Sequence, residues 1–339
     1  MINIKPAIWF PSVKTNTGTD RFAEQLVATL NQRGFQAEIT WLPHHAEFFP
    51  WGVTRPEPPS WANVIHINSW LHPRFYQGFG LPIVTTCHGS VHDHALNPYK
   101  TLLQKMYHQV WVKSLEKQAY QNSAYIAAVS EYTARITREA FGDITISTIP
   151  NWLPKEAFST DEKPSTHTPF RLLFLGRLSK RKGADLLVPI MHGLGNDFEL
   201  HYTMHPEDKA GDSHNLENMK RLGWTSNSNQ IKEWIDNADA LIFPSRMEGM
   251  PLAVLECMAR GLPVICSNSS SLPELIQHGT HGLICPVDNV TSFIEAAQYL
   301  QKNPDTYRAM SAAAKNRALL QYNQEASISK YISIYQALV

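Results

Sequence analysis

Two glutamates eight positions apart, Glu248 and Glu256, flank a segment that could bind a sugar phosphate. Pro251 suits the first position of a helix, where its missing N–H costs nothing. At 1.5 Å rise per residue the two carboxylates would lie about 10 Å apart, close to the span of a sugar-diphosphate-ribose unit. The free N–H groups of Gly249–Leu252 would carry the positive end of the helix dipole, which attracts phosphate. A solvated loop glutamate followed by a surface charge on a helix explains this window equally well.

Four cations follow a predicted strand at Arg171–Leu175, and they lie within the segment Arg177–Lys182. Cations held close to a departing diphosphate stabilise the negative charge that develops on it. Arg177 and Lys182, five positions apart around a turn closed by Gly183, are the candidates for this role. Arginine fits phosphate oxygens as a fork, and lysine acts as a point charge. A basic, solvated turn is the alternative.

Two further candidates follow strands in the first half of the chain. Gly18 comes after the first strand and would allow a ligand to approach the backbone, although an ordinary turn capped by Thr17 or Thr19 explains it as well. His88 follows the strand Pro82–Cys87 and begins a short segment rich in histidine, in which His92, Asp93 and His94 could also bind a metal. No equally dense partner cluster follows, so we expect neither a metal nor another cofactor.

Short runs rich in valine and isoleucine alternate with longer amphipathic segments, a pattern typical of α/β units on a parallel sheet. The pattern occurs twice and lapses between Pro150 and Pro169, a polar stretch with several prolines. We therefore expect two doubly wound, Rossmann-like domains at 1–160 and 168–322, a helix at about 323–339 that packs back on the first, and ligands in an interdomain cleft. The predicted strands are Ile4–Phe10, Phe35–Leu42, Val64–Asn68, Pro82–Cys87, Ala124–Val129, Ile144–Ile149, Arg171–Leu175, Phe198–Met204, Met219–Gly223, Ala240–Pro244, Pro263–Ser267 and Gly282–Cys285. The longest predicted helices are Thr19–Arg33 and Tyr99–Gln121.

Composition restricts the possible partners. The 339 residues include 30 Lys and Arg against 30 Asp and Glu, so the formal net charge is zero. This balance gives no support to a nucleic-acid binder that works by counterion release. The sequence has no apolar run of about 18 residues and no signal peptide pattern, and its four cysteines form no CxxC pair. We expect a cytoplasmic protein with reduced thiols that binds small molecules.

Taken together, these segments resemble the retaining glycosyltransferases of family 4, of the type that makes bacterial surface polysaccharides. That family has the GT-B fold of two facing doubly wound domains. The resemblance covers nearly the whole chain in the expected order. It rests on Gly18, on Ala127–Glu131, on Ile149–Asn151, on Gly176-Arg177 with Lys182-Gly183, and on Pro244-Ser245 with Glu248, Glu256 and Gly261–Val264.

The resemblance implies a role for each candidate residue. Arg177 and Lys182 would hold the donor diphosphate, Glu256 the ribose hydroxyls, and Leu222 and its neighbours the base. The transferred sugar would contact Glu248 and the backbone of Gly249, Met250, Pro251 and Leu252. His88 would lie near the reacting centre, and Gly18 in a loop that contacts donor or acceptor. The implied reaction is metal-independent hexosyl or related transfer from a nucleotide sugar to a hydroxyl of a glycan or a lipid-linked acceptor.

The sequence departs from the family pattern in three places. Thr17 and Thr19 flank Gly18 where many members have paired glycines, Gly89 follows His88 where aspartate is common, and Met250-Pro251 replaces a frequent Phe-Gly pair. A sugar-nucleotide 2-epimerase, a non-catalytic nucleotide-sugar-binding protein and, more remotely, a metal-dependent hydrolase stay open as alternatives.

The segment Tyr99–Lys117 is basic, aromatic and amphipathic. It could rest on anionic lipid at the inner membrane face. A helix that packs its apolar side on the core and exposes its basic side is the favoured interpretation.

Overall fold

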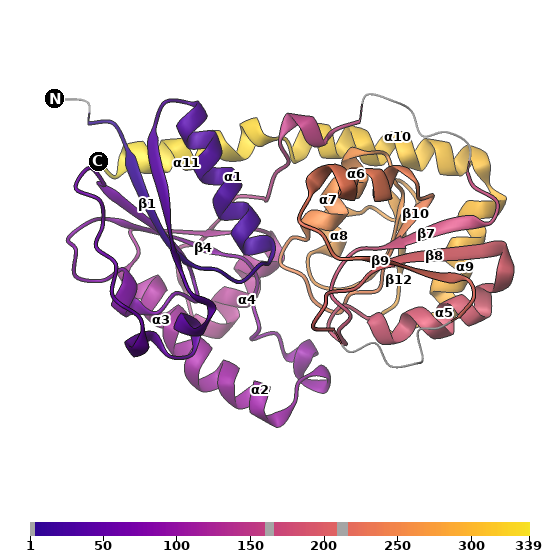
Figure 1. Ribbon diagram of the computed structural model, residues 1–339, viewed down its shortest axis with the longest axis horizontal. Coiled ribbons are helices and arrows are strands. Elements are labelled where there is room, and N and C mark those ends of the chain that lie inside the picture. Colours follow the sequence, from indigo (N-terminus) through magenta and orange to yellow (C-terminus); the bar gives the residue numbers. More distant parts are fainter. Residues whose placement is uncertain (1–3, 160–165, 209–215) are drawn as a thin grey trace. The chain divides into compact units, whose positions relative to one another are not determined.

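The computed structural model describes residues 4–159, 166–208 and 216–339, which form two compact α/β units (Figure 1). The first unit combines Met1–Asn151 with Gln324–Val339, and the second is Trp152–Asn323. Residue 160, where we expect the first domain to end, lies outside the described residues. Residues 152–159 belong to the second unit.

The first unit contains a six-stranded sheet in the order β2-β1-β3-β4-β5-β6, and its strands run parallel. The sheet centre is buried because helices cover it, which explains the continuous apolar runs of its strands. The first strand begins three residues later than predicted, since its ladder with β2 starts at Ala7 opposite Gln36. The strands are β1 (Ala7–Val13), β2 (Gln36–Leu42), β3 (Val64–Asn68), β4 (Ile83–Cys87), β5 (Tyr125–Ala128) and β6 (Ser147–Thr148).

Helix α1 (Gly18–Gln32) matches its prediction to within a residue and ends before Gly34, whose positive φ of 78° suits glycine. The predicted single helix at Tyr99–Gln121 is wrong in its detail. Thr101 starts a new helix by forming a capping box with Gln104, and a π-helical turn follows that helix. The resulting elements are α2 (Leu102–Tyr107), the π turn (His108–Val112) and α3 (Lys113–Asn122).

Helices α4 (Glu131–Phe141) and α11 (Gln324–Ala337) complete the first unit. The C-terminal helix α11 bonds to the sheet through two buried tyrosines. Tyr331 contacts Thr86 through their hydroxyls at 3.0 Å, and the hydroxyl of Tyr335 lies 2.5 Å from Nδ1 of His66. These bonds complete the hydrogen bonding of His66 and Thr86, which are fully buried and also contact each other at 2.8 Å.

The second unit contains a parallel sheet in the order β12-β11-β10-β7-β8-β9. Counted within this unit, the order is that of the dinucleotide-binding fold, and the strand order reverses between β7 and β10. In folds of this kind ligands bind beside such a reversal, at the carboxyl ends of the strands. The strands are β7 (Phe170–Phe174), β8 (Phe198–Thr203), β9 (Met219–Gly223), β10 (Ala240–Phe243), β11 (Val264–Ser267) and β12 (Gly282–Cys285).

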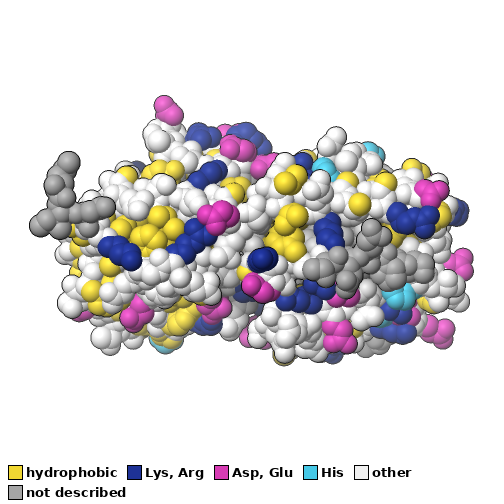
Figure 2. Space-filling view, turned by 90° about the horizontal axis from the view of Figure 1, so that it is seen from above, with side chains coloured by type: hydrophobic (Ala, Val, Ile, Leu, Met, Phe, Trp, Pro, Cys, Tyr) yellow, Lys and Arg dark blue, Asp and Glu magenta, His cyan; other side chains and the backbone are white. Residues whose placement is uncertain are grey.

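The helices of the second unit enclose an apolar core in which Phe174, Ile242 and Phe293 are fully buried. In the parts of the chain that the structure describes, no helix has both the length and the apolar character needed to cross a bilayer. Charged side chains of both signs are scattered over the face shown in Figure 2, as expected for a chain without net charge. The helices are α5 (Leu187–Leu194), α6 (Ser228–Asp236), α7 (Leu252–Ala259), α8 (Leu272–Leu275), α9 (Val290–Lys302) and α10 (Pro304–Gln321).

Candidate functional site

The loop after β10 is fixed onto the turn after β7 by one buried arginine. The guanidinium of Arg246 donates two hydrogen bonds to Asp185, at 2.7 and 2.8 Å, and a third to Asp288 at 2.7 Å. It also bonds to the carbonyl of Lys180, and its own backbone N–H donates to the carbonyl of Arg181 at 2.8 Å. The two loops that flank the reversal of strand order are therefore held as one body.

Gly183 is needed where these two loops meet. Its φ is +70°, and a Cβ atom on it would lie 2.1 Å from the carbonyl oxygen of Pro244. Only glycine allows this approach without moving the backbone of the neighbouring loop. The glycine that closes the basic turn in the sequence thus also sets its distance to the Glu248 loop.

Lys182 and Glu248 form a buried ion pair at this junction. Nζ of Lys182 lies 2.7 Å from Oε1 of Glu248, and the two side chains are 15% and 7% exposed. A guanidinium nitrogen of Arg181 lies 3.6 Å from the same oxygen, and the hydroxyl of Ser245 donates to it at 2.5 Å. The backbone N–H of Glu248 donates to Oγ of Ser270 at 2.9 Å. The structure thus brings together two residues that the sequence selected from separate motifs.

The environment keeps Glu248 ionised. Burial alone would raise the pKa of this carboxyl, but the charges of Lys182 and Arg181 and the hydroxyl of Ser245 lower it below its ordinary value. The stem of Lys182 passes close to Gly176, where an added Cβ would meet its Cδ and Cε at 3.7 Å. The result is a charged pair with satisfied hydrogen bonds at the carboxyl edge of the sheet.

Arg177 has different partners from those of Lys182. Its Nε donates to Asp208 at 2.9 Å, and another nitrogen lies 3.4 Å from Glu207. Asp208 also accepts from the backbone N–H groups of Leu178 and His205. Although burial opposes it, these bonds and the guanidinium lower the pKa of Asp208. The side chain of Arg177 is 47% exposed, so it can still contact a ligand.

Helix α7 begins at Leu252, and Pro251 is its N-cap with φ −73° and ψ 117°. The prediction that Pro251 occupies the first helical position is wrong, because its ψ is extended. Glu248 lies in the loop before the helix and Glu256 within the helix, as the sequence predicts. Gly249, Met250, Pro251 and Leu252 are buried, whereas Glu256 is partly exposed. Leu222 lies in β9, whose carboxyl end is on the same edge of the sheet.

In the first unit, His88 follows β4 and bonds to the end of β3. Its Nε2 lies 2.9 Å from Oδ1 of Asn68, and Asn68 in turn donates to Oγ of Ser12 in β1 at 3.1 Å. The ring of Phe22 packs edge-on against the imidazole, with the two ring centroids 4.5 Å apart. Burial lowers the pKa of His88 to about 3. A neutral ring with a proton on Nε2 leaves Nδ1 as an acceptor.

The other members of the histidine-rich segment have separate partners. Nε2 of His92 lies 2.6 Å from Oε2 of Glu116 in α3, Asp93 accepts from the hydroxyl of Tyr132, and His94 is exposed. Within the described ranges, no three His, Cys, Asp or Glu side chains form a group that could hold a metal.

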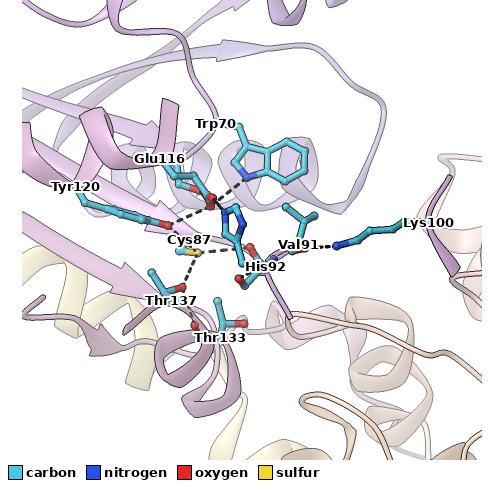
Figure 3. Close-up of polar contacts among 12 residues, drawn as sticks. Trp70, Cys87, Val91, His92, Lys100, Glu116, Tyr120, Thr133 and Thr137 are labelled. Atoms are coloured by element: carbon cyan, nitrogen blue, oxygen red, sulfur yellow. Dashed lines mark hydrogen bonds and ion pairs between the residues drawn. The ribbon is translucent and has the colours of Figure 1, made fainter. Parts of the chain in front are cut away.

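Figure 3 shows the buried network around Glu116. Trp70 and Tyr120 donate to its Oε1, both at 3.2 Å, and Lys100 donates to the carbonyl of Val91. The hydroxyl of Tyr120 also contacts Sγ of Cys87. These bonds anchor the loop that begins at His88 to α3.

Gly18 is the first residue of α1 and is exposed. The loop before it is ordered by Asp20, which accepts hydrogen bonds from the backbone N–H groups of Thr15 and Asn16 at 2.9 and 2.6 Å. Thr17 is the N-cap of α1 but makes no capping bond with its side chain. The glycine loop is thus shaped by a buried aspartate that the sequence did not single out.

Several residues that bond to the candidate site residues of the two units were not identified from the sequence. In the second unit, Arg246 stands inside the Glu248 window, but its partners are far away in the sequence. In the first unit, Asn68 ends a predicted strand, which is the one local signal that it could face a ligand. The residues that were missed are Asp20, Asn68, Glu116, Asp185, Asp208, Arg246, Ser270 and Asp288.

Two family models match adjacent parts of the chain. The model described as "Glycosyltransferase Family 4" matches residues 59–156, and that described as "Glycosyl transferases group 1" matches residues 156–317. Together the two matches span residues 59–317, and the chain belongs to the glycosyltransferases, with a family 4 domain followed by a group 1 domain. Among curated proteins, the amylovoran biosynthesis glycosyltransferase AmsK of Erwinia amylovora is 28% identical over 200 residues, which are 54% of this chain and 48% of AmsK. The putative colanic acid biosynthesis glycosyltransferase WcaL of Salmonella typhimurium is 27% identical over 134 residues, 38% of this chain and 33% of WcaL. The aligned segments thus span half or less of these two relatives.

Solved structures place the chain in the GT-B fold. Sucrose-phosphate synthase of Thermosynechococcus elongatus superposes with a TM-score of 0.81 at 17% identity and covers 98% of this chain and 99% of its own. Anabaena HepE in complex with UDP and glucose gives a TM-score of 0.73 at 13% identity over 98% of this chain and all of its own (100%). At such identities the likeness concerns the fold alone.

Proposed function

We propose that the protein is a retaining glycosyltransferase of cell-surface polysaccharide synthesis. It transfers a sugar from a nucleotide-diphosphate sugar to a hydroxyl of a glycan or lipid-linked acceptor. The family membership and the names of the relatives support this class of reaction. The observation that carries the proposal is the buried pair of Lys182 and Glu248, fixed by Arg246 where the strand order reverses.

We propose that the second unit binds the donor. Lys182 and Arg177 contact the diphosphate, which would replace Glu248 and Asp208 as the partner of each cation. Glu248, released from Lys182, accepts hydrogen bonds from sugar hydroxyls together with the backbone of Gly249, Met250, Pro251 and Leu252. Glu256 binds the ribose, and the base lies against Leu222. The positive N-terminal end of α7 adds to the attraction for phosphate.

The proposed reaction needs positive charge at the departing diphosphate while the sugar gains oxocarbenium character. Lys182, Arg177 and the start of α7 supply that charge, so the proposal includes no metal ion or other cofactor. The acceptor hydroxyl approaches on the face that the nucleotide leaves, and the departing phosphate takes its proton. We assign no covalent step to Glu248.

We assign the first unit to the acceptor side. His88 contacts the reacting centre as a neutral hydrogen-bonding group, since its low pKa keeps it uncharged near neutrality. The loop at Gly18, ordered by Asp20, contacts donor or acceptor through its backbone. We place the reaction on the cytoplasmic side of the membrane. The four cysteines, all free and buried, support a reducing compartment.

A thermal-shift screen of UDP-, GDP- and ADP-sugars tests donor binding. A ligand present at a hundred times its Kd stabilises the folded state by about 2.7 kcal/mol, so one class of nucleotide sugar should raise Tm clearly. The Lys182→Ala variant should show a much smaller rise. If none of the nucleotide sugars stabilises the wild-type protein, the donor assignment is wrong.

Product analysis tests the reaction itself. With the donor from the screen and a panel of glycan acceptors, NMR of the product should show the anomeric configuration of the donor. Inversion would refute the retaining mechanism. A control without acceptor distinguishes transfer from 2-epimerisation, because an epimerase would convert the donor there. The relatives' names favour transfer.

A further inference from the structure

Arg181 is one of the four cations that follow β7, and the proposed function gives it no role. Its backbone is fixed, because its carbonyl accepts from the N–H of Arg246 at 2.8 Å and from the hydroxyl of Ser245 at 3.2 Å. One guanidinium nitrogen donates to the carbonyl of Met247 at 2.9 Å and lies 3.6 Å from Oε1 of Glu248. The guanidinium is therefore held beside a buried carboxylate.

Arg181 and Lys182 contact this carboxylate in different ways. The ammonium of Lys182 bonds to it directly, at 2.7 Å, and the lysine side chain is 15% exposed. The side chain of Arg181 is 46% exposed. A guanidinium has five N–H donors, and among the described residues Arg181 makes one hydrogen bond with them. Lys182 is the direct partner of Glu248 in this structure, and Arg181 is near enough to become one by a small rotation of its side chain.

The proposed donor would change which partner Glu248 needs. A diphosphate that binds Lys182 draws the ammonium away from a carboxylate that is 7% exposed, and a buried charge without a counter-charge is costly. The hydroxyl of Ser245 supplies a hydrogen bond but no charge. Within the described parts of the chain, Arg181 is the one other cation that pairs with Glu248.

We propose that Arg181 is a positioning residue that takes over as the counter-charge of Glu248 when the diphosphate binds Lys182. The guanidinium, anchored by the carbonyl of Met247, then keeps the carboxylate ionised and in place to accept from the sugar hydroxyls. This role rests on the proposed function, because it needs a ligand that engages Lys182.

A double-mutant cycle tests the proposal without any donor, since K182A removes the ammonium as the diphosphate would. In the wild-type background, R181M should raise the unfolding equilibrium constant by less than about fivefold, because the side chain is half exposed and Lys182 remains. In the K182A background the increase should be about tenfold larger, because Glu248 then loses its last cation. Urea unfolding at pH 7 measures both. R181K/K182A, which keeps a positive charge, should be about as stable as K182A.

A second cycle tests the bound state, with calorimetric titration of the UDP-, GDP- or ADP-sugar that the thermal-shift screen selects. R181M should raise the Kd of this nucleotide sugar by about tenfold or more, while its stability hardly changes. In the E248Q background, R181M should change the Kd by less than about twofold, because no carboxylate needs a counter-charge. K180M is the matched control. Lys180 is exposed in the same turn, and the ion pairs of Glu248 with described residues do not include it, so the Kd should stay within about twofold of the wild-type value.

Two results would overturn the proposal. One is additive losses of stability in R181M and K182A, which would show that Arg181 does not replace Lys182 at Glu248. The other is an effect of R181M on the Kd that persists in full in E248Q, since the guanidinium would then contact the donor itself. If the wild type binds none of the nucleotide sugars, the proposed function fails, while the cycle without donor still decides whether Arg181 compensates Glu248.

Discussion

Replacing Lys182 by alanine should lower both stability and sugar transfer, and a second substitution should separate the two effects. The change leaves Glu248, 7% exposed, without the ammonium 2.7 Å away. Breaking a buried pair typically costs 3–5 kcal/mol, but Arg181 at 3.6 Å and the hydroxyl of Ser245 remain. We therefore expect K182A to lose about 2–3 kcal/mol of unfolding free energy. Transfer should fall by about 10²-fold or more, as for a cation removed from developing charge.

The K182A/E248Q variant removes the uncompensated charge as well. Glutamine can still accept from Ser245, so the double variant should recover most of the lost stability. Its transfer rate should stay low, because the cation is still missing. Urea unfolding followed by circular dichroism gives the stabilities, and initial rates at saturating donor give the transfer. A K182A variant as stable as the wild type, or a double variant no more stable than K182A, would refute the buried-pair reasoning.

The pair of Lys182 and Glu248 also predicts how the unfolding free energy changes with pH. The pKa of Glu248 is lower in the folded protein than in the unfolded chain, where it is about 4.3. The ionised carboxylate therefore contributes to stability above pH 4.3, and this contribution is lost as the pH falls through the folded pKa. The stability difference between wild type and K182A should therefore shrink in strong acid. A difference that grows as the pH falls from 5 to 3 would contradict this assignment.

Three further substitutions test other parts of the site. R246A should raise the KM for the donor and lower stability by about 1–2 kcal/mol, because it removes the hydrogen bonds to Asp185 and Asp288, whose carboxylates are 41% and 39% exposed and so partly solvated. R135A, which removes an exposed pair with Glu139, is the matched control and should be nearly neutral. E256A should weaken donor binding in calorimetry, and an unchanged dissociation constant would remove Glu256 from the site. H88N should lose less stability than the wild type between pH 6.5 and 5, by on the order of 1–2 kcal/mol, because the folded His88 resists protonation that the unfolded chain accepts. Parallel curves of stability against pH for the two proteins would show that the pKa of His88 is not lowered in the folded state.

The strands were predictable because parallel strands covered on both sides leave a strong local signal. Runs such as Val64–Asn68 and Gly282–Cys285 match the structure to the residue, since Gly, Pro and polar neighbours mark their ends. The break between α2 and α3 was harder to predict from the sequence. A π turn inserts one residue and so rotates the side chains after it by about 100°, which a search for a single 3.6-residue period does not reveal.

The sequence selected the candidate residues by their types and positions, but it could not show how they pair. Lys182 and Glu248 each stand out beside a strand end, yet their contact joins residues that are 66 positions apart. Arg177 and Lys182 looked equivalent in the sequence, but in the structure Arg177 bonds to Asp208 and not to Glu248. Neither Asp185 nor Asp208 has a local pattern that reveals it as a partner of an arginine. Such pairings depend on strand order, which a single sequence does not encode locally.

The pairing has a consequence for how the proposed donor would bind. A diphosphate that replaces Glu248 as the partner of Lys182 would separate the ammonium from a carboxylate that accepts from Ser245 and whose backbone N–H donates to Ser270. The displaced carboxylate would need new hydrogen-bond donors in a buried position, and the hydroxyls of a sugar could supply them. A nucleoside diphosphate without a sugar would leave that carboxylate with only Ser245 and the more distant Arg181 as partners. We therefore expect the intact nucleotide sugar to bind more tightly than the free diphosphate, and the difference to disappear in the E248Q variant, where no charge is stranded. Calorimetric titration of both ligands against both proteins measures it, and equal affinities for the wild type would show that Glu248 does not contact the sugar.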